Sequence, residues 1–296
     1  MQLASIACSS CRSRPASYYR ASSGERLCRV CLERSLARIV KDTLARLAGL
    51  TPRDHIVVPV DAALKGRTLA MLRLLGLVEK QYPSTLSVVF LYEPPPGDLE
   101  LARRLDPKGS DLYVAYTGSR PGGPGSLLER LRMLRALGGG AARRLGANVV
   151  ALPLLRDELS KLMLAELLRG SVEGVLEHRP SLSHGDLKYV YPLYRVSSED
   201  LAFYTHALGL EPGEACGDAL EADVGGLLLR LFSESRELSY SMPKSAEFLR
   251  EAAGSGGSCS VCGAEGGAPV CDVCSRLGLG ETIRTLDVRS ASSGSP

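Results

Sequence analysis

The sequence predicts an α/β fold in which a doubly wound, mostly parallel sheet is flanked by a small cysteine-rich module at each end of the chain. Two observations support this prediction. Short apolar segments alternate with helical segments at least four times through the middle of the chain, which is the pattern of a parallel sheet with crossover helices. Two Cys-x-x-Cys pairs precede this region and two more follow it.

The first element expected in the central region is a helix over residues 33–50, where apolar residues recur at helical spacing until Thr51-Pro52 ends it. Four short runs rich in Val, Leu and Tyr follow along the chain, and each predicts a buried strand. These strands are expected at 55–60, 86–93, 111–116 and 148–152. Helices are expected at 68–80, 98–105, 127–146, 157–168, 197–210, 219–233 and 243–252.

The loops after these strands are the expected places for a ligand. In doubly wound sheets, ligands bind where the carboxyl ends of the strands meet, near the change in strand order. We therefore expect a binding site among residues 61–67, 117–125 and 153–156.

The four Cys-x-x-Cys pairs predict two structural zinc sites. Each pair holds two thiolates at a separation that suits one tetrahedral metal ion, and two pairs complete a four-sulfur site. Disulfides are an alternative, but the opening segment MQLASIA lacks the basic region and the long apolar run of a secretory signal. An iron–sulfur cluster also uses four thiolates. The predicted ligands are Cys8, Cys11, Cys28 and Cys31 in one site, and Cys259, Cys262, Cys271 and Cys274 in the other.

The composition divides the chain into four parts. Residues 1–34 form the first zinc ribbon, and residues 35–253 form the α/β domain with its linking helix. Residues 254–280 form the second ribbon. Residues 281–296 end in SASSGSP, which is poor in apolar side chains, and we expect a flexible tail there.

The charge of the chain is informative only locally. A net charge of +3 over 296 residues does not by itself argue for nucleic acid, and no apolar run has the length of a membrane span. The helix over 127–146 is nevertheless rich in arginine. It predicts either a solvated helix face or a surface that contacts the phosphates of a nucleic acid. The candidate contacts are Arg130, Arg132, Arg135, Arg143 and Arg144.

Several motifs together resemble a known family. The stretch GANVVALPLLRDELSKLMLAELLRGS is similar to a family segment with paired acids and a Leu-Arg-Gly ending, and YPLYRVSSEDLAFYTHALGL is similar to its Pro-Leu to Gly-Leu helix. Cys216 falls where the family has a cysteine after that helix. With the two terminal ribbons, these features resemble the cytoplasmic tRNA 2-thiolation proteins of the PP-loop, or N-type ATP pyrophosphatase, superfamily. The resemblance covers nearly the whole chain and implies a PP-loop-type core, like that of the adenine nucleotide alpha hydrolases.

The resemblance also implies a chemistry. Active members adenylate the wobble uridine (U34) of tRNA with ATP, and a sulfur carrier then delivers sulfide. They need a Ser-Gly-Gly-x-Asp-Ser loop whose backbone N–H groups cradle phosphate. They also need a Cys-x-x-Cys pair and one later cysteine for a catalytic iron–sulfur cluster, and a Gly-His with nearby acids.

This chain departs from the family at each of these points. Asp61 replaces the first serine of the loop, and Lys65 replaces its aspartate. No cysteine lies between Cys31 and Cys216. Pro153-Leu154 stands in place of Gly-His, and of the later residues only the acids Asp157 and Glu158 are kept. The degenerate loop, which is the candidate nucleotide site, comprises Asp61, Ala62, Ala63, Lys65, Gly66 and Arg67.

These losses, with the scaffold kept, predict a non-catalytic subunit of the thiolation pathway. It would bind tRNA in the cytoplasm and form a dimer with a homologous catalytic PP-loop thiolase, together with a ubiquitin-like sulfur carrier and without a membrane. The losses argue against ATP and against an iron–sulfur cluster, although Lys65 and Arg67 keep charges that suit an anion. Two alternatives stay open. One is an active ATP-dependent tRNA sulfurtransferase with a divergent site, and the other is a zinc-ribbon adaptor without an RNA role.

Overall fold

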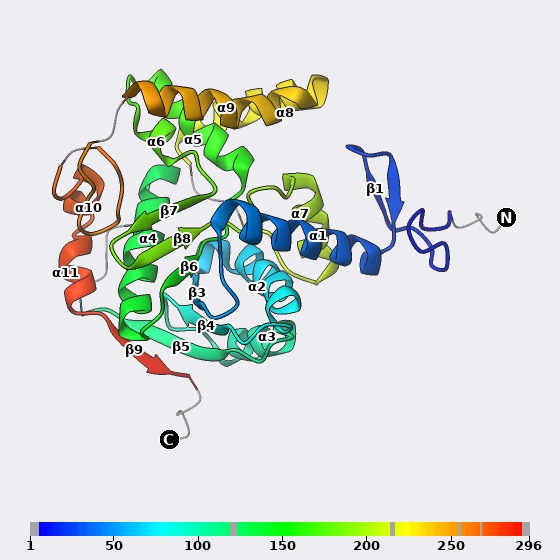
Figure 1. The fold of residues 1–296 in the computed structure, drawn as a ribbon, viewed down its shortest axis with the longest axis horizontal. Coiled ribbons are helices and arrows are strands. Elements are labelled where there is room, and N and C mark those ends of the chain that lie inside the picture. Colours follow the sequence, from blue (N-terminus) through cyan, green and yellow to red (C-terminus); the bar gives the residue numbers. More distant parts are fainter. Residues whose placement is uncertain (1–5, 119–122, 214–216, 254–255, 267, 292–296) are drawn as a thin grey trace.

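The computed structural model describes residues 6–118, 123–213, 217–253, 256–266 and 268–291. A seven-stranded sheet forms its centre, with the strand order β7-β8-β6-β3-β4-β5-β9 (Figure 1). The five inner strands are parallel, and the edge strands β7 and β9 run antiparallel to their neighbours. The predicted α/β fold with a mostly parallel sheet is thus confirmed. The strands are β3 (His55–Val60), β4 (Thr85–Phe90), β5 (Asp111–Tyr116), β6 (Val149–Ala151), β7 (Ser181–His184), β8 (Leu187–Val190) and β9 (Asp287–Ser290).

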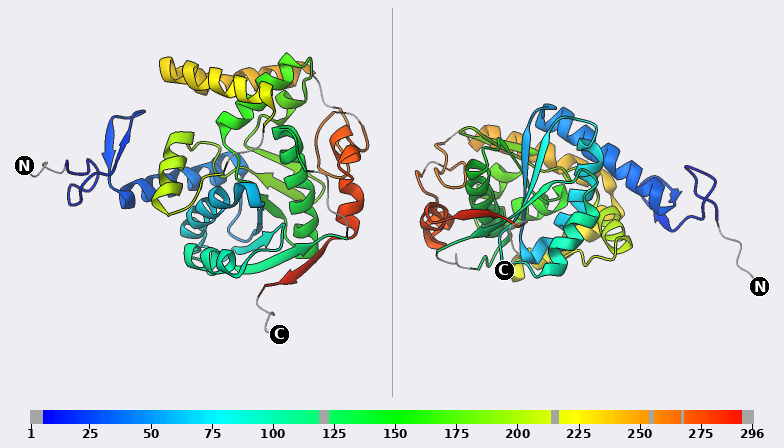
Figure 2. Two further views of the ribbon diagram at one scale, coloured as in Figure 1. Left: turned by 180° about the vertical axis from the view of Figure 1, so that it is seen from behind. Right: turned by 90° about the horizontal axis from the view of Figure 1, so that it is seen from below.

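Helices cover both faces of this sheet (Figure 2). Successive side chains of a strand point to opposite faces, so Ile56 and Val58 of β3 join one apolar core while Val57 joins the other. The first core contains side chains of α1 (Arg29–Thr43), α2 (Lys65–Glu79), α3 (Pro96–Leu105) and α7 (Ser198–Ala207). The second contains those of α4 (Leu127–Arg144), α5 (Arg156–Leu168), α10 (Asp272–Arg276) and α11 (Leu279–Arg284).

Three successive glycines let α4 approach its neighbours closely. A Cβ on Gly138 would lie 3.0 Å from the Val150 side chain, and one on Gly139 would lie 2.2 Å from the hydroxyl of Tyr189. A Cβ on Gly140 would meet Ile283 of α11 and Leu286, which follows that helix. Glycine in a helix interior costs about 1 kcal/mol relative to alanine, and here close packing on three sides offsets that cost.

A helical layer covers one end of the molecule (Figure 1). It consists of α6 (Glu173–Glu177), α8 (Ala219–Glu234) and α9 (Arg236–Ala253), which pack against α5. The predicted helix over 243–252 is longer in the structure, because α9 begins before Pro243 and contains that proline. Small apolar clusters hold the layer, one around Met163, Val175 and Ala246, and another around Ala165, Val224 and Leu228.

The N-terminal module stands at the far end of α1 from the sheet (Figure 1). It contains a hairpin of β1 (Tyr18–Arg20) and β2 (Glu25–Leu27), which pair antiparallel. The Tyr18 ring stacks on Phe203 of α7 with centroids 4.6 Å apart, and Arg20 donates to Asp200 over 3.1 Å. At the other end of α1, a π-helical turn (Leu44–Ala48) ends at Gly49, which has a left-handed backbone.

The prediction of a flexible tail over 281–296 is wrong for residues 281–291, which the structure places in the fold. Residues up to Arg284 complete α11, and Asp287–Ser290 form β9 at the edge of the sheet. Ile283 and Leu286 pack on Gly140 of α4, and β9 pairs with the outer edge of β5. Tertiary packing therefore orders a segment whose composition alone argues for disorder. The final residues of the predicted tail lie outside the described residues.

Candidate functional site

The loop after β3 is capped by its own aspartate. Asp61 is the residue before a 3-10 turn (Ala62–Leu64), and its Oδ1 accepts a hydrogen bond from the backbone N–H of Ala63 over 3.0 Å. Helix α2 begins directly after this turn. Free backbone N–H groups at the start of a helix commonly bind anionic ligands. Here the N–H of Ala63 donates instead to the carboxylate of Asp61.

Buried arginines neutralise the acids around this loop. Arg130 of α4, which is 4% exposed, forms an ion pair with the other carboxylate oxygen of Asp61. Arg67 pairs with Glu158 of α5 and also donates to the carbonyl of Gly213 over 3.3 Å. The predicted loop cations are therefore engaged with groups of the protein rather than turned toward an open phosphate site.

Lys65 has a partner as well. Its Nζ lies 2.8 Å from Oδ1 of Asp98, and the hydroxyl of Tyr92 donates to the other oxygen of Asp98 over 2.8 Å. Burial and the Asp98 carboxylate raise the pKa of Tyr92, which therefore stays protonated at neutral pH. Lys65 is partly exposed, so it is the loop cation closest to solvent.

A later segment closes over the loop from outside. A Cβ on Gly66 would lie 1.8 Å from the carbonyl oxygen of Glu211, and one on Gly213 would lie 2.2 Å from that of Ala63. Gly213 also has φ of +65°, a conformation that other residues rarely adopt. Ala63 and Gly66 thus face the backbone of this later segment, which leaves no room for a side chain at Gly66, whereas Ala62 is exposed.

A cavity of about 470 Å³ opens beside Asp61. It lies at the carboxyl ends of β3, β4 and β5, where ligands bind in sheets of this kind. The structure thus brings together Asp61 and Thr117, which belong to two of the three predicted ligand loops. Residues 119–122 of the second loop lie outside the described residues. The cavity is lined by Asp61, Leu91, Tyr92, Glu93, Ala115, Tyr116, Thr117, Met133 and Leu137.

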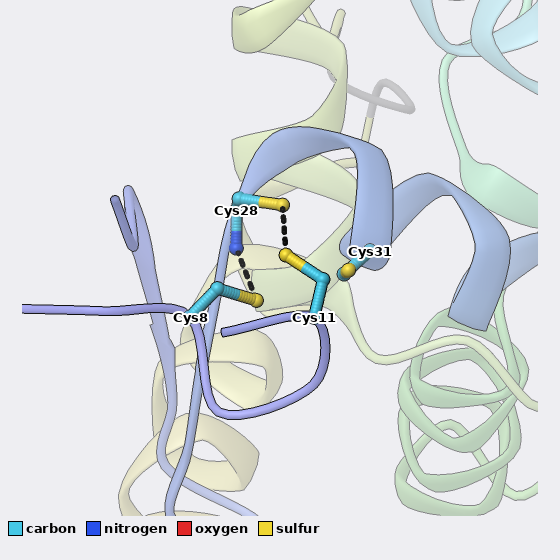
Figure 3. Close-up of side chains that lie close together, drawn as sticks. All are labelled: Cys8, Cys11, Cys28 and Cys31. Atoms are coloured by element: carbon cyan, nitrogen blue, oxygen red, sulfur yellow. Dashed lines mark hydrogen bonds between the residues drawn. The ribbon is translucent and has the colours of Figure 1, made fainter. Parts of the chain in front are cut away.

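The N-terminal cysteines form a four-thiol group (Figure 3). Their Sγ atoms lie within 4.8 Å of one another, and those of Cys11 and Cys28 are 3.9 Å apart. The backbone N–H of Cys28 donates to Sγ of Cys8 over 3.3 Å. Cys28 immediately precedes α1, so the helix start positions the second Cys-x-x-Cys pair against the first.

The C-terminal cysteines repeat this arrangement. Cys262 and Cys271 have Sγ atoms 3.7 Å apart, and the backbone N–H of Cys271 donates to Sγ of Cys259 over 3.3 Å. Here all four cysteines are buried, whereas Cys11 of the first group is partly exposed. All eight are free thiols, so the disulfide alternative has no support among the described residues. Each group offers one tetrahedral set of sulfur ligands.

The arginines of α4 lie in places that the sequence did not indicate. Arg130, Arg132 and Arg135 are buried and form ion pairs inside the protein, so their side chains are not available to a nucleic acid at the surface. Arg144 donates to backbone carbonyls at the end of α11. Arg143 is exposed, and its Nε lies 3.8 Å from a carboxylate oxygen of Asp186. Of the predicted phosphate-contacting set, only Arg143 and Arg144 reach the surface.

A different group of cations is exposed. Six arginines of the first ribbon and α1 are exposed, and none of them forms an ion pair with a described residue. Arg34 and Arg38 are four residues apart and so share one face of α1. That spacing was visible in the sequence and could have identified them. The six are Arg12, Arg14, Arg26, Arg29, Arg34 and Arg38.

The fold and its sites define an α/β protein with a metal-binding module of four thiols near each end. No known protein-family profile matches the chain, and no curated protein matches it. A solved structure shares the fold, namely the U34-tRNA thiolase NcsA from Methanococcus maripaludis with its [4Fe-4S] cluster. The TM-score is 0.69 with 20% sequence identity, over 93% of this chain and 96% of that chain. The two proteins therefore share a fold over nearly the full length of both chains.

The expectation against an iron–sulfur cluster is corrected by these findings. The thiolase of the same fold carries a [4Fe-4S] cluster, and the described part of this chain holds two four-thiol groups. Four thiolates are the ligand set of such a cluster, and they equally suit zinc. Either metal centre is therefore compatible with each group.

No helix among the described residues is long and apolar enough to cross a membrane.

Proposed function

We propose that this chain is a tRNA-binding, non-catalytic subunit in the 2-thiolation of U34, and that it pairs with a catalytic PP-loop thiolase in the cytoplasm. The first support is the shared fold with a U34-tRNA thiolase over nearly the full length of both chains. The second support is the loop after β3, where the Asp61 carboxylate is held by Ala63 N–H and Arg130. A ubiquitin-like sulfur carrier would then act on the catalytic partner rather than on this chain.

The internal ion pair of the loop is the observation that carries the proposal. The Asp61 carboxylate accepts from Ala63 N–H and pairs with buried Arg130. A phosphate at the same place would meet a fixed negative charge and would have to compete for the same donors. The cysteines also stand apart from the loop, since all eight described ones belong to the two terminal modules. The chain keeps the scaffold of a thiolase and fills its phosphate position with an aspartate.

The N-terminal ribbon and α1 supply the surface for tRNA in this proposal. None of their six exposed arginines forms an ion pair with a described residue, so each can contact a phosphate without first losing one. Phosphate contacts account for most non-specific affinity for nucleic acids and make binding sensitive to salt.

We expect the double substitution Arg34→Ala/Arg38→Ala to weaken tRNA binding and to reduce its salt dependence. Each lost phosphate contact lowers the slope of log Kd against log salt concentration by about 1. Fluorescence anisotropy with labelled tRNA at several salt concentrations measures both quantities. The matched control is Arg103→Ala/Arg104→Ala at the end of α3, where both side chains are also exposed. Equal slopes for the two double variants would contradict the assignment of this surface.

The subunit role is tested by reconstitution. The purified chain with tRNA, ATP and sulfide is expected to form no 2-thiouridine, and to co-elute with an active PP-loop thiolase in size-exclusion chromatography. Formation of 2-thiouridine by the chain alone would instead establish the second candidate, an ATP-dependent tRNA sulfurtransferase with a divergent site. The cavity of about 470 Å³ beside Asp61 is the feature that favours that candidate.

A further inference from the structure

The C-terminal metal module is docked on the buried face of α4. Arg276 of α10 donates to Glu129 of α4 over 2.6 Å, and Arg179 donates to Glu265 of the module over 2.8 Å. Gly263 lies against His184 of β7, where a Cβ would come within 2.7 Å. The four cysteines share an apolar core with Leu131 and Leu134 of α4. The module is thus part of the main core rather than an appendage.

Two fully buried arginines of α4 lie in this region. Arg132 and Arg135 are both 0% exposed, and both pair with the same carboxylate, that of Glu177, which is 1% exposed. Arg132 also lies 3.3 Å from an oxygen of Glu173, whose side chain is partly exposed to solvent. Two fully buried guanidinium groups therefore share one fully buried anion, and a second, partly exposed acid contacts Arg132.

Several N–H groups of these two arginines also lack a partner among the described residues. Nη2 of Arg132, and Nε and Nη1 of Arg135, have neither a hydrogen bond nor an ion pair within the described protein. Burial of a charged group is costly unless it is paired and hydrogen-bonded. Part of the hydrogen-bonding capacity of the two guanidinium groups is therefore free for a further anionic partner near α4.

The thiols of the module are among the charges that act on these arginines. Burial lowers the pKa of Arg132, but Glu177, Glu173, Cys271 and Cys262 together outweigh burial and raise it. For Arg135, burial is likewise outweighed by Glu177, Tyr191 and Cys262, and its pKa is raised. Four thiolates outweigh the charge of a zinc ion, and also that of an iron–sulfur core, so a loaded centre of either kind is a net anion.

We propose that Arg132 and Arg135 are positioning residues of the C-terminal metal centre, and that they provide the buried positive charge that balances its four thiolates. The centre and the two arginines then stabilise each other, while Glu177 competes with the thiolates for the same cations. The N-terminal centre has no such partners, since no fully buried arginine lies among the described residues of its module. This role does not depend on which metal is bound.

Zinc release from the full-length chain tests the proposal. The protein is loaded with Zn²⁺, and transfer to a chromophoric chelator is followed over time. The Cys8→Ser chain, which lacks a complete N-terminal site, identifies the phase of the C-terminal site. We expect Arg135→Met to speed release from the C-terminal site by about 10- to 100-fold, the usual effect of losing an outer-shell partner. Release from the N-terminal site is expected to stay unchanged.

A second variant separates charge balance from general stability. Glu177→Gln removes the competing anion, so we expect slower release from the C-terminal site although the substitution also disturbs the core. Arg130→Met, which breaks a buried ion pair on the same helix away from the thiols, is expected to leave both release rates unchanged. Faster release in Glu177→Gln, or equal acceleration by Arg130→Met and Arg135→Met, would overturn the proposal. If Arg135→Met does not fold, the direction of the Glu177→Gln effect decides.

Discussion

Substitution of Cys259 by serine is expected to abolish cooperative unfolding of the α/β domain at room temperature, whereas Cys8→Ser is expected to leave that transition in place. Both residues are 0% exposed and both open a four-thiol group, so they form a matched pair. Binding of a structural metal contributes on the order of 10–16 kcal/mol, which equals or exceeds the net stability of a typical domain.

The positions of the two modules explain the difference. The C-terminal cysteines lie in the same apolar core as Val57, Val89 and Val150 of the sheet, so loss of their metal exposes that core. The N-terminal cysteines belong to the other apolar core, but their module lies at the far end of α1 from the sheet and packs on α1 and α7 (Figure 1). Thermal unfolding followed by circular dichroism, with metal content measured in parallel, checks both variants. Equal losses of the transition would contradict this account of the C-terminal module.

Removal of one partner of the loop ion pair is the second large effect that we expect. Asp61→Ala leaves Arg130 buried and without its carboxylate, and breaking a buried pair in this way costs about 3–5 kcal/mol of unfolding free energy. The double variant Asp61→Ala/Arg130→Met removes both charges and should recover most of that loss. Urea unfolding of the single and double variants measures the coupling.

A surface pair on the same helix provides the control. Arg143 lies 3.8 Å from Asp186, and both side chains are well exposed. Arg143→Met should therefore change stability by no more than about 1 kcal/mol. If Asp61→Ala costs no more than Arg143→Met, the loop is not held by a strong internal ion pair, and the aspartate would not block a phosphate.

Four of the five inner strands could be predicted from sequence because they are buried on both faces and therefore carry nearly unbroken apolar runs, whereas the inner strand β8 (LKYV) was not predicted. HIVVPV predicted β3 with its correct bounds, and DLYVAY did the same for β5. The edge strands β7 and β9 could not be predicted in this way. Their sequences SLSH and DVRS are polar, and it is pairing with β8 and β5 that makes them strands.

Some features of the candidate site could likewise be predicted from local sequence, and others could not. The spacing of the eight cysteines is local information, and it correctly predicted both four-thiol groups. The identity of their metal is not encoded in that spacing, since zinc and iron–sulfur clusters use the same ligands. The roles of the α4 arginines depend on distant partners. Arg130 pairs across 69 residues with Asp61, and Arg132 across 45 residues with Glu177.

Arginine is rarely fully buried, so a sequence pattern rich in arginine normally indicates a surface. On α4 that expectation fails for Arg130, Arg132 and Arg135, because the helix is buried on several sides and each of these three finds an acid within the fold. The exposed arginines of α1 follow the usual rule and were visible as an i, i+4 pair. Tertiary context thus reverses the assignment for one arginine-rich helix and supports it for another.

Calorimetric titration of ATP–Mg²⁺ into the metal-loaded full-length chain tests the central claim most directly, with an intact PP-loop thiolase as the positive control. The self-capped loop predicts no detectable heat of binding for this chain under conditions where the control binds. Binding in the micromolar range would contradict the claim, because it would show that Asp61 and Arg130 leave the phosphate position open.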